Sequence, residues 1–322
     1  VGFVWDHYYF AKQIAEALLD TGLAGVVCPT LQDVGGPFVD LLDEQWNDTY
    51  EVCNNKLYQE KGIYSALGPH ATDTVSEKLW EKIRVASEKD SLVVHCHLAQ
   101  SYEEYKRIEN KFNISPTRYL KNLGILDDAV AGVFAHGIFI SESDFKLLDP
   151  YKHYLVFCPF SQNQFLYPAN IMSWCDKGMS WVLATDCAAS NDSMNLQKEL
   201  RYVSGFPAQT VSYTKEYNGF LQGDGVSYLA SQKTRDDLLS RYQDFLDPSW
   251  LLSLVWKTPG SMYPGCKVGV IEEGALANMI VWSNDHPCLW PGQNLKSIVF
   301  CDSSAAIYNM MVAGKWLGEG GS

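Results

Sequence analysis

Short apolar runs alternate with stretches of helical spacing along most of the chain. Residues 11–19 and 76–88 repeat apolar side chains every three or four positions, which is typical of helices, and Ser76 is a suitable N-cap for the second stretch. Strands separated by helices of this size predict parallel βα units. The predicted strands are residues 1–5, 25–28, 63–67, 92–96, 130–135, 154–157 and 181–184.

A polar or ionisable residue follows each predicted strand close to its carboxyl end. In a (β/α)8 barrel of the TIM type, this end of the strands carries the active site. The pattern provides one strand fewer than such a barrel needs, so we predict an α/β fold of this type whose first strand is absent from the chain. The strand-end residues are His7, Gln32, His70, His97, His136, Ser161 and Asp186.

The pattern changes from about residue 268 onwards. Apolar runs at 268–271, 279–282, 297–300 and 307–312 are joined by turns rich in Gly, Pro and Asn. They predict short strands with no helices between them. We therefore expect two units, a barrel over residues 1–265 and the C-terminal part of a composite β-sandwich over residues 266–322.

Composition narrows the class of protein. The 322 residues are 47% hydrophobic and 20% charged, and they carry a formal net charge of −13. Such a charge argues against nucleic acid or an anionic membrane as a partner, and it leaves a small-molecule substrate as the expected one. The sequence has no membrane-spanning apolar run and does not begin like a signal peptide. The nine scattered cysteines suggest reduced thiols and a cytoplasmic location.

Three of the strand-end residues are typical metal ligands. Zinc and similar ions bind imidazole and carboxylate groups, and a catalytic site keeps one position open for water. His97, His136 and Asp186 each follow a predicted strand, so closure of a barrel would direct all three into one mouth. The sequence therefore predicts a divalent metal site formed by these residues.

Several short motifs together resemble the amidohydrolase superfamily. The similar branch is the one that contains guanine deaminase, adenosine-type deaminases and triazine chlorohydrolases. Each motif alone is weak, whereas their combined order is specific. The motifs are HCHLAQ at 95–100, AHG at 135–137, TDCAASN at 185–191, GPHA at 68–71, CPFS at 158–161, GALANMIVW at 274–282 and MVAGK at 311–315.

The resemblance implies a function and a set of roles. His97, His136 and Asp186 would bind one divalent metal ion, with zinc expected first and iron or manganese as alternatives. Asp186 would also accept a proton from the water that attacks, and His70 would bind the substrate. Ser161 could line a polar substrate pocket, although a plain loop residue is equally expected there. The implied reaction is hydrolysis of a non-peptide carbon–nitrogen bond, by deamination of a cyclic amidine or a heteroaromatic amine, and a homodimer is a family expectation.

Gln100 departs from the family pattern, because the deaminase branch has glutamate at this position. An amide can hold a substrate by hydrogen bonds, but it cannot move protons near neutral pH. Three alternatives remain open. Asp186 carries all the proton transfers, or the reaction needs less protonation of the leaving group, as hydrolytic dechlorination does, or the chain is an inactive scaffold. Retention of His97, His136 and Asp186 favours the first two, so we assign Asp186 and Gln100 as catalytic and His70, Gln100 and Ser161 as substrate-binding.

A second departure concerns the start of the chain. The family places a His-x-His pair on its first strand, and no such pair precedes His95. We expect that an N-terminal segment is missing, and the rival explanation is a protein that has lost its metal site. His95 shares a strand face with His97. We interpret it as a buried histidine of the barrel interior, because no family motif has a ligand at that position.

Overall fold

A computed structural model describes residues 1–167, 170–292 and 294–318 of the chain. Residues 293 and 319–322 of the second predicted unit lie outside the described residues. The parallel strands are β1 (Phe3–Tyr8), β2 (Ala24–Leu31), β3 (Ile63–Ser65), β4 (Gly68–Pro69), β5 (Val94–Leu98), β6 (Gly132–His136), β7 (His153–Phe157) and β8 (Trp181–Leu183). The helices of this part are α1 (Ala11–Thr21), α2 (Leu42–Asn54), α3 (Lys56–Glu60), α4 (Glu77–Asp90), α5 (Tyr102–Phe112), α6 (Pro116–Asn122), α7 (Pro159–Gln164) and α8 (Ile171–Asp176).

The strands pair in parallel, in chain order. β2 lies between β1 and β3, and β4 pairs with the end of β2. β5, β6, β7 and β8 form a second parallel series. Isolated bridges from Leu67 to Val94 and from Ala71 to His97 join the two series. Each predicted strand position therefore carries a parallel strand, and the predicted α/β class is confirmed.

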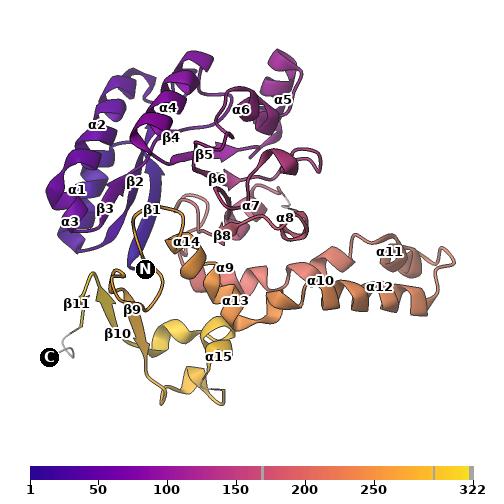
Figure 1. Cartoon of the computed structure of the whole chain (residues 1–322). Helices are drawn as coiled ribbons and strands as arrows, with labels where there is room; N and C mark the ends of the chain where they lie inside the picture. The colour runs from indigo at the N-terminus through magenta and orange to yellow at the C-terminus, as the bar shows by residue number, and fades with distance from the viewer. Residues whose placement is uncertain (168–169, 293, 319–322) are drawn as a thin grey trace.

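The side of the fold between β8 and β1 is covered by a later segment of the chain and not by strand pairing. Among the described residues no backbone pairing joins these two strands, so closure of a full barrel stays a prediction. The chain after α13 (Pro248–Ser253) runs along this side, where the Leu254 carbonyl accepts the Leu183 N–H at 3.1 Å. The Tyr263 hydroxyl then donates to the Ser65 carbonyl at 3.2 Å. Figure 1 shows α14 (Lys257–Gly260), which precedes Tyr263, next to β8.

Alternation along the strands separates two packing faces. On β5, Cys96 and Leu98 pack in the main core against the helices. Val93 belongs instead to the cluster enclosed by the strands. His95 and His97 have the same parity as Val93, so they lie on the inner face.

The C-terminal part differs from its prediction. It contains one antiparallel sheet, in the order β11 (Lys315–Trp316), β10 (Ile307–Val312), β9 (Met279–Trp282). The predicted strands at 268–271 and 297–300 are wrong, because the first is irregular and the second lies in α15 (Leu295–Phe300). The Asn294 side chain caps α15 by accepting two backbone N–H groups, and a four-residue apolar run fits a helix as well as a strand. The β-sandwich stays a prediction.

Asn278 connects this C-terminal sheet to the first strand. Its side-chain amide donates to the Gly2 carbonyl at 3.1 Å, just before β1. Its side-chain oxygen accepts the Ala313 N–H at 2.8 Å, just after β10. The C-terminal sheet therefore lies next to the start of β1, as Figure 1 also shows.

The remaining helices lie mostly on one side of the molecule. Three of them extend away from the strands as an arm (Figure 1), namely α10 (Phe206–Val211), α11 (Lys215–Gln222) and α12 (Tyr228–Arg241). No helix in the described part of the chain is both long enough and apolar enough to cross a lipid bilayer. The helix α9 (Leu196–Val203) precedes this arm in the chain.

Candidate metal centre

Histidine rings gather at the carboxyl ends of the strands. His97, on β5, stacks on His136, the last residue of β6, with ring centroids 5.4 Å apart and planes 14° apart. His7, on β1, stacks on the His97 ring at 4.9 Å. His70 and His95 also contact this group, at 5.1 Å from His97 and 5.0 Å from His7 respectively. The fold thus brings five imidazoles from separated parts of the sequence into one cluster.

A carboxylate and a thiol adjoin this cluster. Asp186 follows β8, and Cys158 follows β7. A ring nitrogen of His136, the Cys158 sulfur and an Asp186 carboxylate oxygen all lie within 4.8 Å of one another. The structure therefore brings together the three predicted ligands, His97, His136 and Asp186, and places next to them a sulfur that the sequence did not predict as part of the site.

Hydrogen bonds orient the two predicted ligands His97 and Asp186. His97 Nδ1 donates to the His70 carbonyl at 2.7 Å, which leaves Nε2 as the nitrogen with a free lone pair in the neutral ring. The Ser161 hydroxyl donates to Asp186 Oδ2 at 2.6 Å, and the Cys187 N–H donates to Asp186 Oδ1 at 2.7 Å. Each group is therefore fixed by a neighbour and still has lone pairs for a ligand.

The backbone is unusual at three positions of the site. Ala99, His136 and Asp186 have φ angles of 50°, 76° and 62°, in the left-handed region that residues other than glycine rarely adopt. On β6, the side chains of Val133 and Ala135 face the space enclosed by the strands. Strict alternation would therefore direct the side chain of His136 towards the helices. The left-handed φ breaks the alternation and lets its ring stack on His97. Local strain of this kind often occurs at functional sites.

Burial keeps the clustered histidines neutral. Burial and the neighbouring His97 together lower the pKa of His136 to about 4, against the opposing effect of the Asp186 carboxylate. Burial also lowers the pKa of His97, against the opposing effects of the His70 carbonyl and the Asp186 carboxylate. Neutral imidazole is the form that binds metal ions.

The residues fit a divalent transition metal. His136 is only 8% exposed, and its Nδ1 is buried without a hydrogen-bond partner among the residues that the structure describes. An unpaired buried nitrogen costs free energy, and a metal ion would satisfy it. Together with the available Nε2 of His97 and the carboxylate of Asp186, it makes a donor set that suits zinc.

The predicted substrate-binding residues lie around this cluster. His70 Nδ1 lies 2.9 Å from the Thr74 hydroxyl, and burial lowers the pKa of His70 to about 4. Ser161 is 1% exposed, and its hydroxyl bonds to Asp186 and Ser190. Its observed contact therefore fixes Asp186, and contact with a substrate stays a prediction.

Gln100 is held through its backbone by a buried acid. Its N–H donates to Glu104 Oε2 at 2.7 Å, and the Ala99 N–H donates to Glu104 Oε1 at 3.1 Å. The Thr72 hydroxyl donates to the same Glu104 oxygen at 2.5 Å. Glu104 is 1% exposed, and burial raises its pKa to about 7. This carboxylate positions the turn that carries Gln100.

The sequence analysis missed three residues of the site. His7 was predicted only as a strand-end residue, and Cys158 was counted only among the cysteines expected to be reduced. Glu104 was not singled out, although an acid four positions after Gln100 in the first turn of α5 is a recognisable signal. His95 is 7% exposed with Nδ1 3.4 Å from the Cys28 sulfur, which agrees with its predicted place in the interior.

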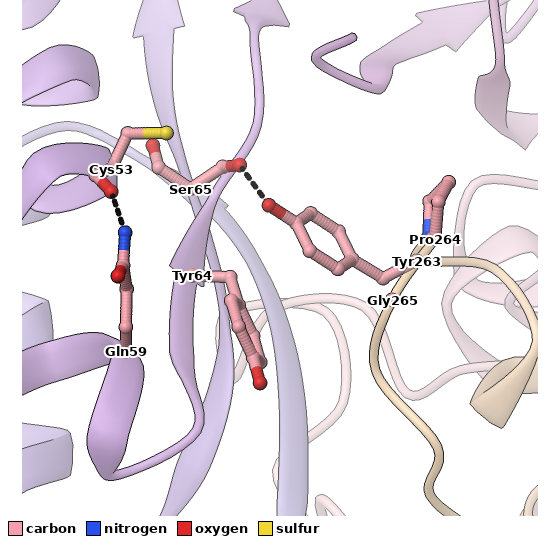
Figure 2. Close-up of a pocket in the computed structure, with 7 residues that line it drawn as sticks. All are labelled: Cys53, Gln59, Tyr64, Ser65, Tyr263, Pro264 and Gly265. Carbon is pink, nitrogen blue, oxygen red and sulfur yellow. Dashed lines mark hydrogen bonds between the residues drawn. The ribbon is translucent and has the colours of Figure 1, made fainter.

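A separate cavity lies beside β3, where Tyr64 and Ser65 line it (Figure 2). Its volume is about 350 Å³. Figure 2 shows the Tyr263 hydroxyl directed at the Ser65 carbonyl across it. None of the predicted site residues lines this cavity. The lining residues are Cys53, Gln59, Tyr64, Ser65, Tyr263, Pro264 and Gly265.

Comparisons with known proteins agree with this arrangement. The model of the Amidohydrolase family matches residues 1–218. The 5'-deoxyadenosine deaminase of Methanopyrus kandleri is 23% identical over 318 residues, which cover 98% of this chain and 66% of that protein. The chain thus spans slightly less than two thirds of the length of this relative.

Solved structures share the fold. An adenosine deaminase from Xanthomonas campestris with bound zinc superposes with a TM-score of 0.78 at 18% identity, over 98% of this chain and 65% of that one. The zinc complex of atrazine chlorohydrolase from Arthrobacter aurescens gives the same TM-score and identity, over 99% and 68%. The family match extends over more than half of the chain and includes all three predicted ligands. The chain therefore belongs to the amidohydrolase family.

Proposed function

We propose that the protein is a metal-dependent hydrolase that acts on a carbon–nitrogen bond other than a peptide bond. The proposed reaction is deamination of a heteroaromatic amine or a cyclic amidine, with one divalent ion, zinc first, bound by His97, His136 and Asp186. The convergence of these side chains at the ends of β5, β6 and β8 carries the proposal. The similarity to a deaminase of an adenosine derivative and to zinc-bound structures supports it.

The chain's own groups suggest how the reaction would proceed. A divalent metal supplies Lewis acidity, which makes water a nucleophile near neutral pH. Asp186 is the proposed base that takes a proton from this water. The donors Ser161 and Cys187 hold its carboxylate in one orientation. His70 and Gln100 are the proposed hydrogen-bonding partners of the substrate.

Gln100 favours a second candidate reaction, hydrolytic dechlorination of a heteroaromatic ring. An amine leaves a ring carbon only after it gains a proton, whereas chloride leaves without one. The amide of Gln100 cannot supply that proton. The shared fold of atrazine chlorohydrolase is consistent with this alternative.

We also propose the division of the chain into a barrel unit, residues 1–265, and a C-terminal unit, residues 266–322. The change from parallel to antiparallel pairing supports this division. The hydrogen bond from Asn278 to the Gly2 carbonyl provides a contact between the two units.

Metal content and turnover test the proposal. The purified protein is stripped with a chelator and reloaded with zinc, and metal is counted by mass spectrometry. Ammonia and chloride release are then measured on adenosine derivatives, guanine and chlorinated triazines. We expect about one metal ion per chain, and loss of at least about 10²-fold in turnover in His97→Ala, His136→Ala and Asp186→Asn.

His286→Ala is the matched control. This histidine lies in a turn of the C-terminal part, where its Nδ1 lies 3.0 Å from the Cys288 sulfur. Metal content and turnover should be unchanged in this variant. Retained turnover in all three ligand variants would refute the site, and protein without bound metal or turnover would identify an inactive scaffold.

A further inference from the structure

Glu199 is a buried acid whose contacts join two segments of the site. It lies on α9, which packs against α7 and β8, and it is 2% exposed. Its Oε2 accepts the Phe160 N–H at 3.2 Å, in the first turn of α7 after β7. Its Oε1 accepts the side-chain amide of Asn191, which follows β8, at 2.7 Å. One carboxylate therefore connects the segments that follow these two strands.

Both connections lead to Asp186. Ser161, in the same turn of α7, donates its hydroxyl to Asp186 Oδ2 at 2.6 Å. The Asn191 amide also donates to the carbonyl of Thr185, the residue before Asp186, at 2.9 Å. Glu199 is thus linked both to the hydroxyl that orients the Asp186 carboxylate and to the backbone that carries it. The φ of Asp186, 62°, is of a kind that persists only where surrounding contacts maintain it.

The orientation of the Asn191 amide is maintained at a cost. Its nitrogen donates to both Thr185 and Glu199, whereas its Oδ1 is buried without a hydrogen-bond partner among the residues that the structure describes. A buried acceptor without a donor costs free energy. The reversed amide would place Oδ1 against the oxygens of both partners, so the two acceptors fix the amide in the observed direction.

We propose that Glu199 is a positioning residue that fixes Asp186 for metal binding. The proposal rests on the metal site proposed above and adds the acid that organises it. Without this carboxylate, the first turn of α7 and the segment after β8 lose their common acceptor, and the Asp186 carboxylate loses its fixed direction. Loss of an outer-shell partner typically lowers metal affinity by about 10–100-fold.

The zinc affinity of Glu199→Gln tests the proposal without any substrate. Glutamine has the same shape but only one side-chain oxygen, so its amide nitrogen must face the Phe160 N–H or the Asn191 amide. Zinc affinity is measured by chelator competition, at a temperature where circular dichroism shows each variant folded. We expect it to fall by at least about 10-fold. The visible d–d bands of the cobalt(II)-loaded protein report ligand geometry, and they should change as well.

Two control variants separate positioning from stability. Leu200→Ala removes a core side chain, 1% exposed, from the next position of α9, so it destabilises the fold without altering the carboxylate. Glu216→Gln makes the same chemical change at an exposed position of α11. Both variants should retain the zinc affinity and the cobalt bands of the wild type. An equal loss of zinc affinity in Leu200→Ala and Glu199→Gln would overturn the positioning role.

A double-mutant cycle with Ser161→Ala tests the route from Glu199 to Asp186. Because part of this route passes through the turn that carries Ser161, the loss of zinc affinity in the double variant should be smaller than the product of the two single losses. Single losses that multiply in the double variant would show that the two residues act independently, and they would overturn the proposal.

The remaining outcomes separate this proposal from the function it extends. Unchanged zinc affinity in Glu199→Gln would overturn it and leave the metal site intact. Asn191→Ala removes one of the two connections alone and carries the same test if Glu199→Gln does not fold. We expect its zinc affinity to fall as well, and an unchanged affinity would overturn the proposal. A wild type that binds no zinc would overturn both proposals.

Discussion

Replacing Glu104 by glutamine tests how the turn after β5 is held. The carboxylate accepts the Ala99 N–H on one oxygen and the Gln100 N–H on the other. A glutamine of the same shape has only one oxygen, so its amide nitrogen must face one of these two donors. That backbone N–H is then buried without an acceptor. The Thr72 hydroxyl can rotate to accept instead, so it adds little to the loss.

The magnitude follows from the number of unpaired groups. One buried donor without an acceptor costs about 1–3 kcal/mol, so we expect Glu104→Gln to lower the free energy of unfolding by that amount. Glu104→Ala leaves both N–H groups unpaired, and its cost should be roughly twice as large. The measurement is urea denaturation at pH 8, above the pKa of about 7, where the carboxylate is mostly ionised.

The loss of stability in Glu104→Gln should be accompanied by a loss of zinc affinity. His97 lies three residues before Gln100, so loosening this turn should also weaken zinc binding. The control is Glu103→Gln, an exposed acid in the same turn of α5, whose replacement should change stability by less than about 0.5 kcal/mol. If Glu104→Gln matches Glu103→Gln in both stability and zinc affinity, the buried carboxylate does not position the site.

Three further changes probe other parts of the account. Gln100→Glu should speed deamination at least about tenfold if residue 100 faces the leaving group, because a carboxyl group can carry the proton. The rate of ammonia release measures this effect, and an unchanged rate would contradict the catalytic role assigned to Gln100. Ser161→Ala should weaken zinc binding roughly 10–100-fold by freeing Asp186, as measured by chelator competition, and equal affinity would disprove the positioning role. Burial lowers the pKa of His153 from 6.5 to about 4, so as pH falls below 6.5 the unfolded chain is protonated first. The stability of the wild type relative to His153→Gln should therefore decrease by roughly 3 kcal/mol from pH 7 to pH 4 in denaturation curves, and a pH-independent difference would show that His153 is not buried neutral.

Features set by local pattern were predictable from the sequence. Alternation along β5 identified the inner face of His95 and His97 without any knowledge of neighbouring strands. The position of His136 and Asp186 at strand ends was equally clear, because parallel strands align their carboxyl ends. The order in which His97, His136 and Asp186 follow one another around the site is the order of their strands in the sheet.

Features set by distant register or by unusual backbone were not predictable. The stacking of His7 on His97 depends on how β1, β2, β4 and β5 are staggered, and no local signal encodes that. The left-handed φ of His136 also cannot be read from its residue type, because histidine, although enriched in this region, adopts it at only a minority of positions. The helix at 297–300 was missed because its cap, Asn294, is as common in turns as at helix starts.

Anomalous diffraction at the zinc absorption edge tests the central claim most directly. Crystals of the zinc-loaded protein should show one anomalous peak at the carboxyl ends of β5, β6 and β8. That peak should lie about 2.0–2.2 Å from nitrogens of His97 and His136 and from an oxygen of Asp186. A peak elsewhere, or zinc-loaded crystals with no peak among these side chains, would contradict the account.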